Sequence, residues 1–199
     1  MRSGVRAIRY FPWPCSRPQE RVNADSRLRL SMIAGINTFP ALHVDENMSQ
    51  DNSDHDRVTV RLASVGDSES ITVLCHQLGY PTSREEMQQR LEQVLQDERH
   101  AVFVAELSDG RVAGWVHVHL RWLVIADLGA EIEGLVVDQS CRRRGIGRLL
   151  MQRAEEWARR RGCRAVQLRS NVIRKGAHVF YENIGYSIVK TQLTFRKVL

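Results

Sequence analysis

The sequence lacks long apolar runs and closely spaced cysteines. No apolar run approaches the roughly 20 residues that span a bilayer, and the N-terminal region has no apolar core typical of a secretory signal. The four cysteines, Cys15, Cys75, Cys141 and Cys163, lie far apart and form no CxxC pair. This spacing indicates neither a disulfide framework nor a metal site. We therefore expect a cytoplasmic protein with reduced thiols, no metal cofactor and no membrane association.

Proline is nearly absent from the larger part of the chain. Four of the five prolines lie within residues 1–56, which show no sustained hydrophobic period and end in a polar, acidic run from Asp45 to Asp56. Such a composition is typical of disorder. We therefore expect residues 1–56 to be a disordered or mis-annotated N-terminal extension, and residues 57–199 to form one catalytic domain.

Acidic residues are scarce between Arg142 and Lys175. This segment holds twelve basic residues, which only Glu155 and Glu156 oppose. The net charge of +6 arises entirely after residue 56, because residues 1–56 carry seven arginines and seven acids. Such an excess favours a polyanionic partner, either a nucleic acid or a phosphorylated cofactor. The alternative is a solvated helix face, since cations suit the end of a helix.

Hydrophobic periodicity predicts strands and helices in the order β α α β β β α β α β β. Thr82 and Glu85 are expected to form the capping box of the second helix. The crossover from the fourth strand through the third helix to the fifth strand is expected to be parallel and right-handed. The predicted strands cover residues 58–62, 101–107, 112–124, 130–137, 165–169, 186–189 and 193–197, and the predicted helices residues 67–78, 82–97, 147–161 and 176–183.

A loop of arginines and two glycines follows the apolar strand that ends at Val137. Gly145 and Gly147 let backbone N–H groups approach an anion closely. The helix that begins near Gly147 adds unpaired amides and the positive end of its dipole. Arginine adds planar charge with several donors. The loop is therefore predicted to bind phosphate.

Over residues 58–199 the chain resembles the GNAT superfamily of acyl-CoA-dependent N-acyltransferases. The acyl-CoA signature Q/R-x-x-G-x-G/A stands here as Arg142-Arg143-Arg144-Gly145-Ile146-Gly147 after Leu135-Val136-Val137, and a second block stands as Phe180-Tyr181-Glu182-Asn183-Ile184-Gly185-Tyr186. The resemblance implies an α/β (α+β) GNAT fold. Its central sheet would be mixed and mostly antiparallel, with six to seven strands, one parallel βαβ crossover and about four flanking helices. It also implies an N-acetyltransferase with acetyl-CoA as donor and no metal.

The resemblance assigns the donor site as well. It implies that the backbone amides of Arg143, Arg144, Gly145, Gly147 and Arg148 hold the CoA pyrophosphate. It further implies that the strand before them splays from its parallel neighbour, so that the pantetheine arm pairs with its free edge. Arg174 stands where the family often has asparagine, and Asn171 lies further back. The cofactor-binding prediction covers Leu135, Val136, Val137, Arg142, Arg143, Arg144, Gly145, Ile146, Gly147, Arg148 and Asn171.

Acyl transfer to an amine requires a neutral nucleophile and a proton for the leaving thiolate. Glu131 and Glu133 lie two apart in one strand and share a face, where they would attract a cationic amine and relay its proton. The resemblance aligns Glu131 with the base of histone acetyltransferases and Glu133 with the glutamate of polyamine-type enzymes. We favour Glu133, which lies nearer the thioester, and a purely structural acid pair is the alternative.

Tyr181 is the expected general acid, with a core aromatic side chain as the alternative. A backbone N–H near Leu135 or Val136 would stabilise the oxyanion. His117 and His119 form an H-x-H motif, which fits polar residues of an acceptor groove better than a metal site.

The leading hypothesis is therefore direct attack by a primary amine on acetyl-CoA in a ternary complex. Its partner would be a small, cationic amine rather than a nucleic acid, and a homodimer is possible because exposed final strands make dimers common in the family. The alternative is a non-catalytic GNAT-like module that senses acyl-CoA or binds nucleic acid.

Overall fold

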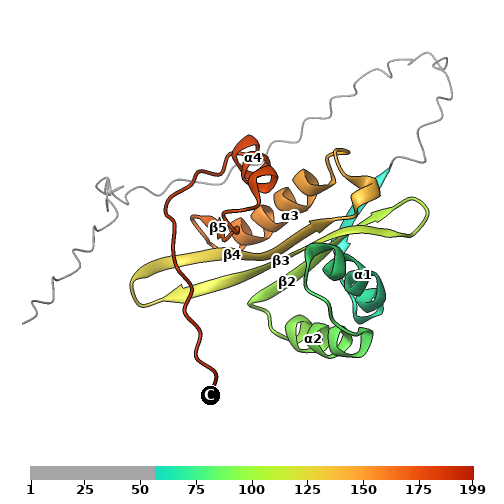
Figure 1. The fold of residues 1–199 in the computed structure, drawn as a ribbon, viewed down its shortest axis with the longest axis horizontal. Helices are drawn as coiled ribbons and strands as arrows, with labels where there is room; N and C mark the ends of the chain where they lie inside the picture. The colour runs from blue at the N-terminus through green and yellow to red at the C-terminus, as the bar shows by residue number, and fades with distance from the viewer. Residues whose placement is uncertain (1–56) are drawn as a thin grey trace, which may run out of the picture. The chain divides into compact units, whose positions relative to one another are not determined.

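A computed structural model describes residues 57–199 (Figure 1). The N-terminal extension predicted for residues 1–56 lies outside the described residues. Two single-turn 3₁₀ helices, Val65–Asp67 and Gln139–Cys141, precede α1 and α3. The main elements are β1 (Val58–Leu62), α1 (Ser68–Leu78), α2 (Arg84–Gln96), β2 (His100–Leu107), β3 (Val112–Leu123), β4 (Ala126–Val137), α3 (Ile146–Arg160), β5 (Val166–Leu168) and α4 (Lys175–Asn183).

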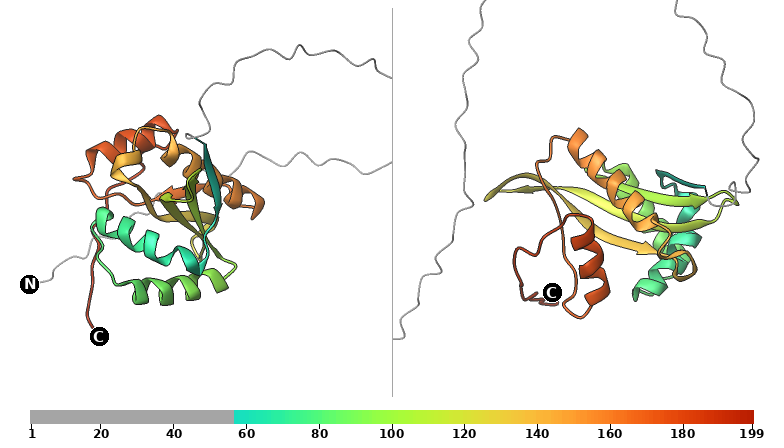
Figure 2. Two further views of the ribbon diagram at one scale, coloured as in Figure 1. Left: turned by 90° about the vertical axis from the view of Figure 1, so that its right-hand side faces the viewer. Right: turned by 90° about the horizontal axis from the view of Figure 1, so that it is seen from above.

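The strands form one mixed sheet in the order β1-β2-β3-β4-β5. The first four strands pair antiparallel, and β5 pairs parallel to β4 after the crossover through α3. Helices α1 and α2 cover one face of the sheet, and α3 and α4 lie on the other face (Figure 2). This arrangement confirms the predicted mixed α/β fold class and the parallel βαβ crossover.

Each face of the sheet has its own apolar core. On one face, Val116 of β3 and Ile132 of β4 pack with Leu150 and Met151 of α3. On the other face, Trp115 and Val136 join the buried stripes of α1 and α2. The alternation of β3 therefore sends successive residues into two different cores, as a strand covered on both faces requires.

A β-bulge interrupts β4 at Glu133. His117 of β3 pairs with Gly134, whereas the next residue, Val118, pairs with Ile132, so that Glu133 is an extra residue in β4. The parallel ladder with β5 also ends here, at the pair Ile132 and Leu168. Because bulges bend a strand and redirect its side chains, β4 leaves β5 at Glu133, and residues 133–137 have no partner on that side within the described chain.

The predicted number of six to seven strands is too high for the described residues, which form five. Residues 186–199 contain no strand, although strands were predicted at 186–189 and 193–197. From Ile188 onward their large apolar side chains are exposed, and Phe195 is 89% exposed. Alternation of apolar and polar residues predicts which side chains of a strand would share a face. A strand also needs the edge of another strand to pair with, and β5 offers an edge of only three residues.

The second helix begins one residue later than predicted. Ser83, rather than Thr82, caps α2, and its hydroxyl accepts the N–H of Glu86 at 3.1 Å. The Glu86 carboxylate reaches back to the N–H of Ser83 and completes the capping box. Within residues 57–199, no helix is both long and apolar enough to cross a membrane.

Candidate functional site

The arginine–glycine loop, residues 142–147, connects the end of β4 to α3. Two of its residues adopt the left-handed region, Gly145 with φ of 80° and Arg143 with φ of 64°. Alternation of backbone handedness turns successive N–H groups toward one side, which is the geometry of an anion-binding concavity. Glycine carries no steric cost at such a φ, whereas Arg143 is a rare non-glycine residue there.

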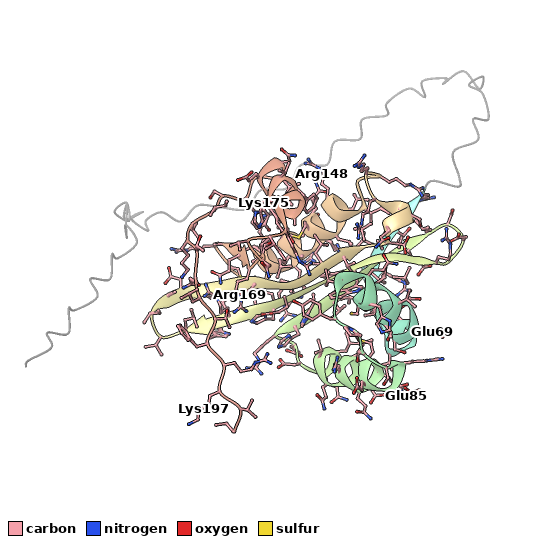
Figure 3. The ribbon with its side chains drawn as sticks, in the orientation of Figure 1. Glu69, Glu85, Arg148, Arg169, Lys175 and Lys197 are labelled. Atoms are coloured by element: carbon pink, nitrogen blue, oxygen red, sulfur yellow. The ribbon has the colours of Figure 1, made fainter. Side chains whose placement is uncertain are left out.

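The first turn of α3 supplies further backbone donors. Leu149 is the first residue whose N–H bonds back along the helix, to the carbonyl of Gly145 at 3.1 Å. The amides of Gly145, Ile146, Gly147 and Arg148 therefore precede the hydrogen-bonded ladder of the helix. Figure 3 marks Arg148 at this end of α3. These amides fit an anionic group such as a pyrophosphate.

Gly147 also fixes the distance between α3 and α4. A Cβ atom at this position would lie 3.2 Å from the ring of Phe180 and 3.7 Å from the side chain of Val137. The absent side chain thus lets the start of α3, the end of β4 and α4 meet at one point.

The arginine side chains around the loop bind backbone carbonyls. Arg142 Nε donates to the carbonyl of Val137 at 3.1 Å, and Arg148 reaches the carbonyl of Asn183 at 3.4 Å. These two basic side chains thus contact the ends of β4 and α4.

The free edge of β4 extends from the bulge to the loop. Val136 is buried against α1 and α2, whereas Leu135 and Val137 pack toward α3 and α4. Unpaired backbone groups at such an edge can accept an extended ligand as an added strand. Asn171 lies elsewhere, in an exposed turn where its Oδ1 accepts the N–H of Ile173 at 3.1 Å. Its side chain is thus already engaged locally.

The structure brings the two predicted acids together but gives them different surroundings. The side chain of Glu131 is 5% exposed and lies against three donors. Arg169 Nε is 2.7 Å from its Oε1, Gln167 Nε2 donates to its Oε2 at 2.9 Å, and Arg121 Nε is 3.6 Å away. At 5% exposure, this carboxylate is poorly accessible to another ligand.

Glu133, the bulge residue, is more accessible. Its side chain is 37% exposed and lies 3.3 Å from His119 Nδ1 and 3.5 Å from Arg169 Nη2. Neither contact is a short, saturated hydrogen bond. Glu133 is therefore the acid of the pair that a ligand or solvent can reach.

Three histidines line the sheet beside Glu133. His100 Nδ1 and His117 Nε2 are 2.9 Å apart, and the rings of His100 and His119 stack with centroids 5.2 Å apart. Burial and the neighbouring histidines lower the pKa of His117 to about 4, and burial also lowers the pKa of His100. Within residues 57–199, no group of three or more His, Cys, Asp or Glu side chains has a geometry that could hold a metal ion.

Tyr181 lies in the last turn of α4, half-buried beside two other aromatic rings. Its ring centroid is 5.2 Å from Phe180 and 6.1 Å from Tyr186. Burial raises the pKa of Tyr181, so the phenol is protonated at neutral pH. Among the described residues, none forms a hydrogen bond with the Tyr181 hydroxyl, whereas the Tyr186 hydroxyl donates to Glu155 at 3.0 Å.

Sequence reasoning missed four polar neighbours of the acids: His100, Arg121, Gln167 and Arg169. Three of them lie in strands, and Arg169 directly follows β5, so the strand register decides which of them stand beside the acids. His119 pairs with Glu131, and Glu131 pairs with Gln167 on its other side. Only the strand register, not the spacing along the chain, carries this signal.

Comparison with known proteins agrees with this geometry. Residues 69–186 match the family model described as the acetyltransferase (GNAT) family. The aminoglycoside N(6′)-acetyltransferase type 1 of Stenotrophomonas maltophilia is 28% identical over 145 residues, which are 71% of this chain and 94% of that protein. An uncharacterized N-acetyltransferase of Methanocaldococcus jannaschii is 38% identical over 86 residues, 42% of this chain. The aminoalkylphosphonate N-acetyltransferase of Salmonella typhimurium is 36% identical over 94 residues, 47% of this chain. The chain spans only 38% and 60% of the last two proteins.

Solved structures show the same fold. Aminoglycoside 6′-N-acetyltransferase AAC(6′)-Ih from Acinetobacter baumannii superimposes with a TM-score of 0.65 at 18% identity, over 72% of this chain and 99% of that one. AAC(6′)-Iy in complex with the bisubstrate analog CoA-S-monomethyl-acetylneamine gives a TM-score of 0.64 at 20% identity, over the same shares. At these identities the likeness concerns the fold.

Proposed function

Because the chain belongs to the acetyltransferase (GNAT) family, we propose that it transfers an acetyl group from acetyl-CoA to a primary amine by direct attack in a ternary complex. We assign this activity to residues 57–199. This part of the chain contains the family match, the anion-binding loop and the acids Glu131 and Glu133. The observation that carries the proposal is the bulge at Glu133. It places an accessible carboxylate where the free edge of β4 begins, and this edge leads to the anion-binding loop.

The donor site fits acetyl-CoA in two respects. The left-handed residues Arg143 and Gly145 and the free amides at the start of α3 suit a pyrophosphate. Because Gly147 has no Cβ, no side chain at this position fills the space between the start of α3, Phe180 and Val137. Residues 135–137 would pair with the pantetheine arm through the free strand edge, and an amide near Leu135 or Val136 would stabilise the oxyanion.

Glu133 is the proposed general base. The acceptor arrives as an ammonium ion and must lose a proton before its nitrogen can attack the thioester carbon. Glu133 is 37% exposed, so an incoming ammonium group can reach its carboxylate, and His119 Nδ1 lies 3.3 Å from its Oε1. Glu131, in contrast, is buried against Arg121, Gln167 and Arg169, which suits a structural role rather than contact with the acceptor.

Tyr181 is the proposed general acid. When the tetrahedral intermediate collapses, the C–S bond breaks and the sulfur leaves as a thiolate that requires a proton. The phenol of Tyr181 is protonated and unbonded, and it can supply this proton. The new amide and free CoA are then the products, and no covalent intermediate on the protein is needed.

The acceptor is proposed to be a small, cationic amine. The site places carboxylates and neutral histidines on one face, which suits an ammonium group rather than a polyanion. Relatives that are acetyltransferases of aminoglycosides and of aminoalkylphosphonates support a small amine acceptor.

The test is a panel of amines incubated with the full chain and acetyl-CoA, with release of free thiol as the readout. We expect thiol release that depends on both substrates and saturates with the amine. Thermal denaturation with acetyl-CoA or with duplex DNA provides the counterpart. Stabilisation by DNA alone, together with absence of thiol release, would refute the proposed function in favour of a nucleic-acid-binding module.

A further inference from the structure

Arg169 contacts both acids of the site while remaining largely in solvent. It directly follows Leu168, the last residue of β5, and Figure 3 marks it beside the sheet. Its Nε lies 2.7 Å from Glu131 Oε1, and its Nη2 lies 3.5 Å from Glu133 Oε1. The Arg169 side chain is nevertheless 73% exposed. A guanidinium thus covers the pair of carboxylates from the open side.

The charges of this group balance only while Arg169 is present. The two carboxylates face two guanidinium groups, those of Arg169 and Arg121. Arg121 is 28% exposed, and its Nη2 donates a hydrogen bond to Gln167 Oε1 at 2.7 Å, which holds the guanidinium in place. If Arg169 swings away, one negative charge is left without a counterion. The site then has room for one positive charge.

Displacing Arg169 leaves no buried charge isolated. Glu131 keeps the hydrogen bond from Gln167 and the nearby charge of Arg121. Because the Arg169 side chain is 73% exposed, its guanidinium regains hydration when it leaves the buried Glu131 and the partly exposed Glu133, which lowers the cost of breaking both ion pairs. An ammonium group of an incoming ligand can therefore exchange with the guanidinium. A neutral ligand cannot, because it brings no charge to compensate Glu133.

We propose that Arg169 is a specificity-determining residue: its guanidinium occupies the place of the acceptor's ammonium group, and only an acceptor that carries a positive charge displaces it. This inference rests on the proposed function and adds the mechanism by which a cationic amine is selected. Arg169 is thus an internal competitor for the acceptor. Its removal strengthens the binding of cationic amines and has little effect on uncharged ones.

The kinetic test compares Arg169→Gln with the wild-type full chain. Butylamine is the cationic probe and aniline the amine that is uncharged at neutral pH. We expect the KM for butylamine to fall by about 3- to 10-fold, as loss of one weak, exposed ion pair predicts, while the KM for aniline and for acetyl-CoA change less than about 2-fold. Arg169→Lys retains a positive charge but not the two-point contact, and we expect it to restore most of the wild-type KM.

Arg160→Gln, at the last residue of α3, is the matched control for loss of an arginine charge. It should leave both amine KM values unchanged. A higher KM for acetyl-CoA in Arg169→Gln would overturn the proposal, because it would assign Arg169 to the donor. A lower kcat at unchanged butylamine KM would also overturn it, because Arg169 would then serve only to hold the acids in place.

A direct measurement is independent of turnover. The Nε–H resonance of Arg169 is assigned by its disappearance in Arg169→Gln and followed in wild-type protein that is saturated with CoA. Displacement predicts that this signal shifts on addition of butylamine and not on addition of aniline. If butylamine shifts the Arg169 signal but no amine is acetylated, the proposed function is refuted, and the displacement of Arg169 by a cation is still supported. Transfer to butylamine without a shift would refute the role of Arg169 alone.

Discussion

Exchanging each glutamate of the site for glutamine tests the proposal that Glu131 is structural and Glu133 is the general base. Glu131→Gln removes a negative charge that is 5% exposed and lies against Arg169, Gln167 and Arg121. Breaking a buried pair from one side costs about 3–5 kcal/mol. Because Arg169 can turn into solvent, we expect a somewhat smaller loss, about 2–4 kcal/mol of unfolding free energy. For a domain of this size, that loss lowers Tm by roughly 6–12 °C.

Glu133→Gln should give the opposite pattern. Its carboxylate is 37% exposed, and its contacts with His119 and Arg169 measure 3.3 and 3.5 Å, so its loss costs less than about 1 kcal/mol of stability. Loss of a general base lowers kcat by about 10²- to 10⁴-fold. The alkaline-rising limb of the rate profile should flatten in Glu133→Gln and persist in Glu131→Gln.

Thermal denaturation and thiol-release kinetics on the same preparations provide the measurement. Glu156→Gln is the control, since that carboxylate contacts Arg153 at 3.3 Å on the exposed side of α3 and should affect neither quantity. If Glu131→Gln melts like wild type but turns over poorly, and Glu133→Gln retains its turnover, the base is Glu131. The assignment from burial would then be wrong.

Three further predictions concern the other parts of the site. Tyr181→Phe should lower kcat by about 10²-fold or more with little change in the KM for acetyl-CoA. The control is Tyr186→Phe, which removes the hydroxyl that binds Glu155 and should retain turnover; equal kcat values for the two variants would remove Tyr181 from the mechanism. Gly147→Val should weaken acetyl-CoA binding and cost about 1–3 kcal/mol of stability because its side chain meets Phe180, whereas Gly176→Ala, with nothing within 4 Å of its Cβ, should not; calorimetric titration with CoA that gave equal affinities would contradict this. Because the folded-state pKa of His117 is lowered to about 4, the unfolded chain binds a proton more readily than the folded chain. The free energy of unfolding should therefore be highest above pH ~6.5 and fall by up to about 3 kcal/mol as the pH drops toward 4; denaturation midpoints of His117→Gln that decline as steeply would exclude this histidine as the source.

The parts of the fold that depend on local sequence were predictable. The stripe of apolar residues in α3 and the alternation in β2 and β3 each point to buried faces, and the structure places those residues in the two cores. The order of elements around the crossover followed from the same signals. The final two strands were wrong because residues 186–199 alternate in the same manner without an edge to join.

The candidate site was less accessible to sequence reasoning, because it depends on register. Alternation placed Glu131 and Glu133 on one face but contained no sign of the bulge that sets Glu133 apart. The partners of Glu131 come from β3 and β5, and a shift of one residue in either pairing would have replaced them all. The burial that distinguishes the two acids is a property of these pairings.

The use of the arginines bears on the choice between a phosphorylated ligand and a nucleic acid. Several side chains of the basic run end on backbone carbonyls at the close of other elements: Arg174 on Leu78 at the end of α1, Arg148 on Asn183 at the end of α4, and Arg142 on Val137 at the end of β4. The last carbonyls of a helix lack partners within that helix, so the first two contacts link the start of α4 to α1 and link α3 to α4. A surface that binds nucleic acid needs its cations free to meet phosphates. Arginines engaged in this way support the amide loop of α3, and the loop, rather than the run of charge, is the part suited to an anion.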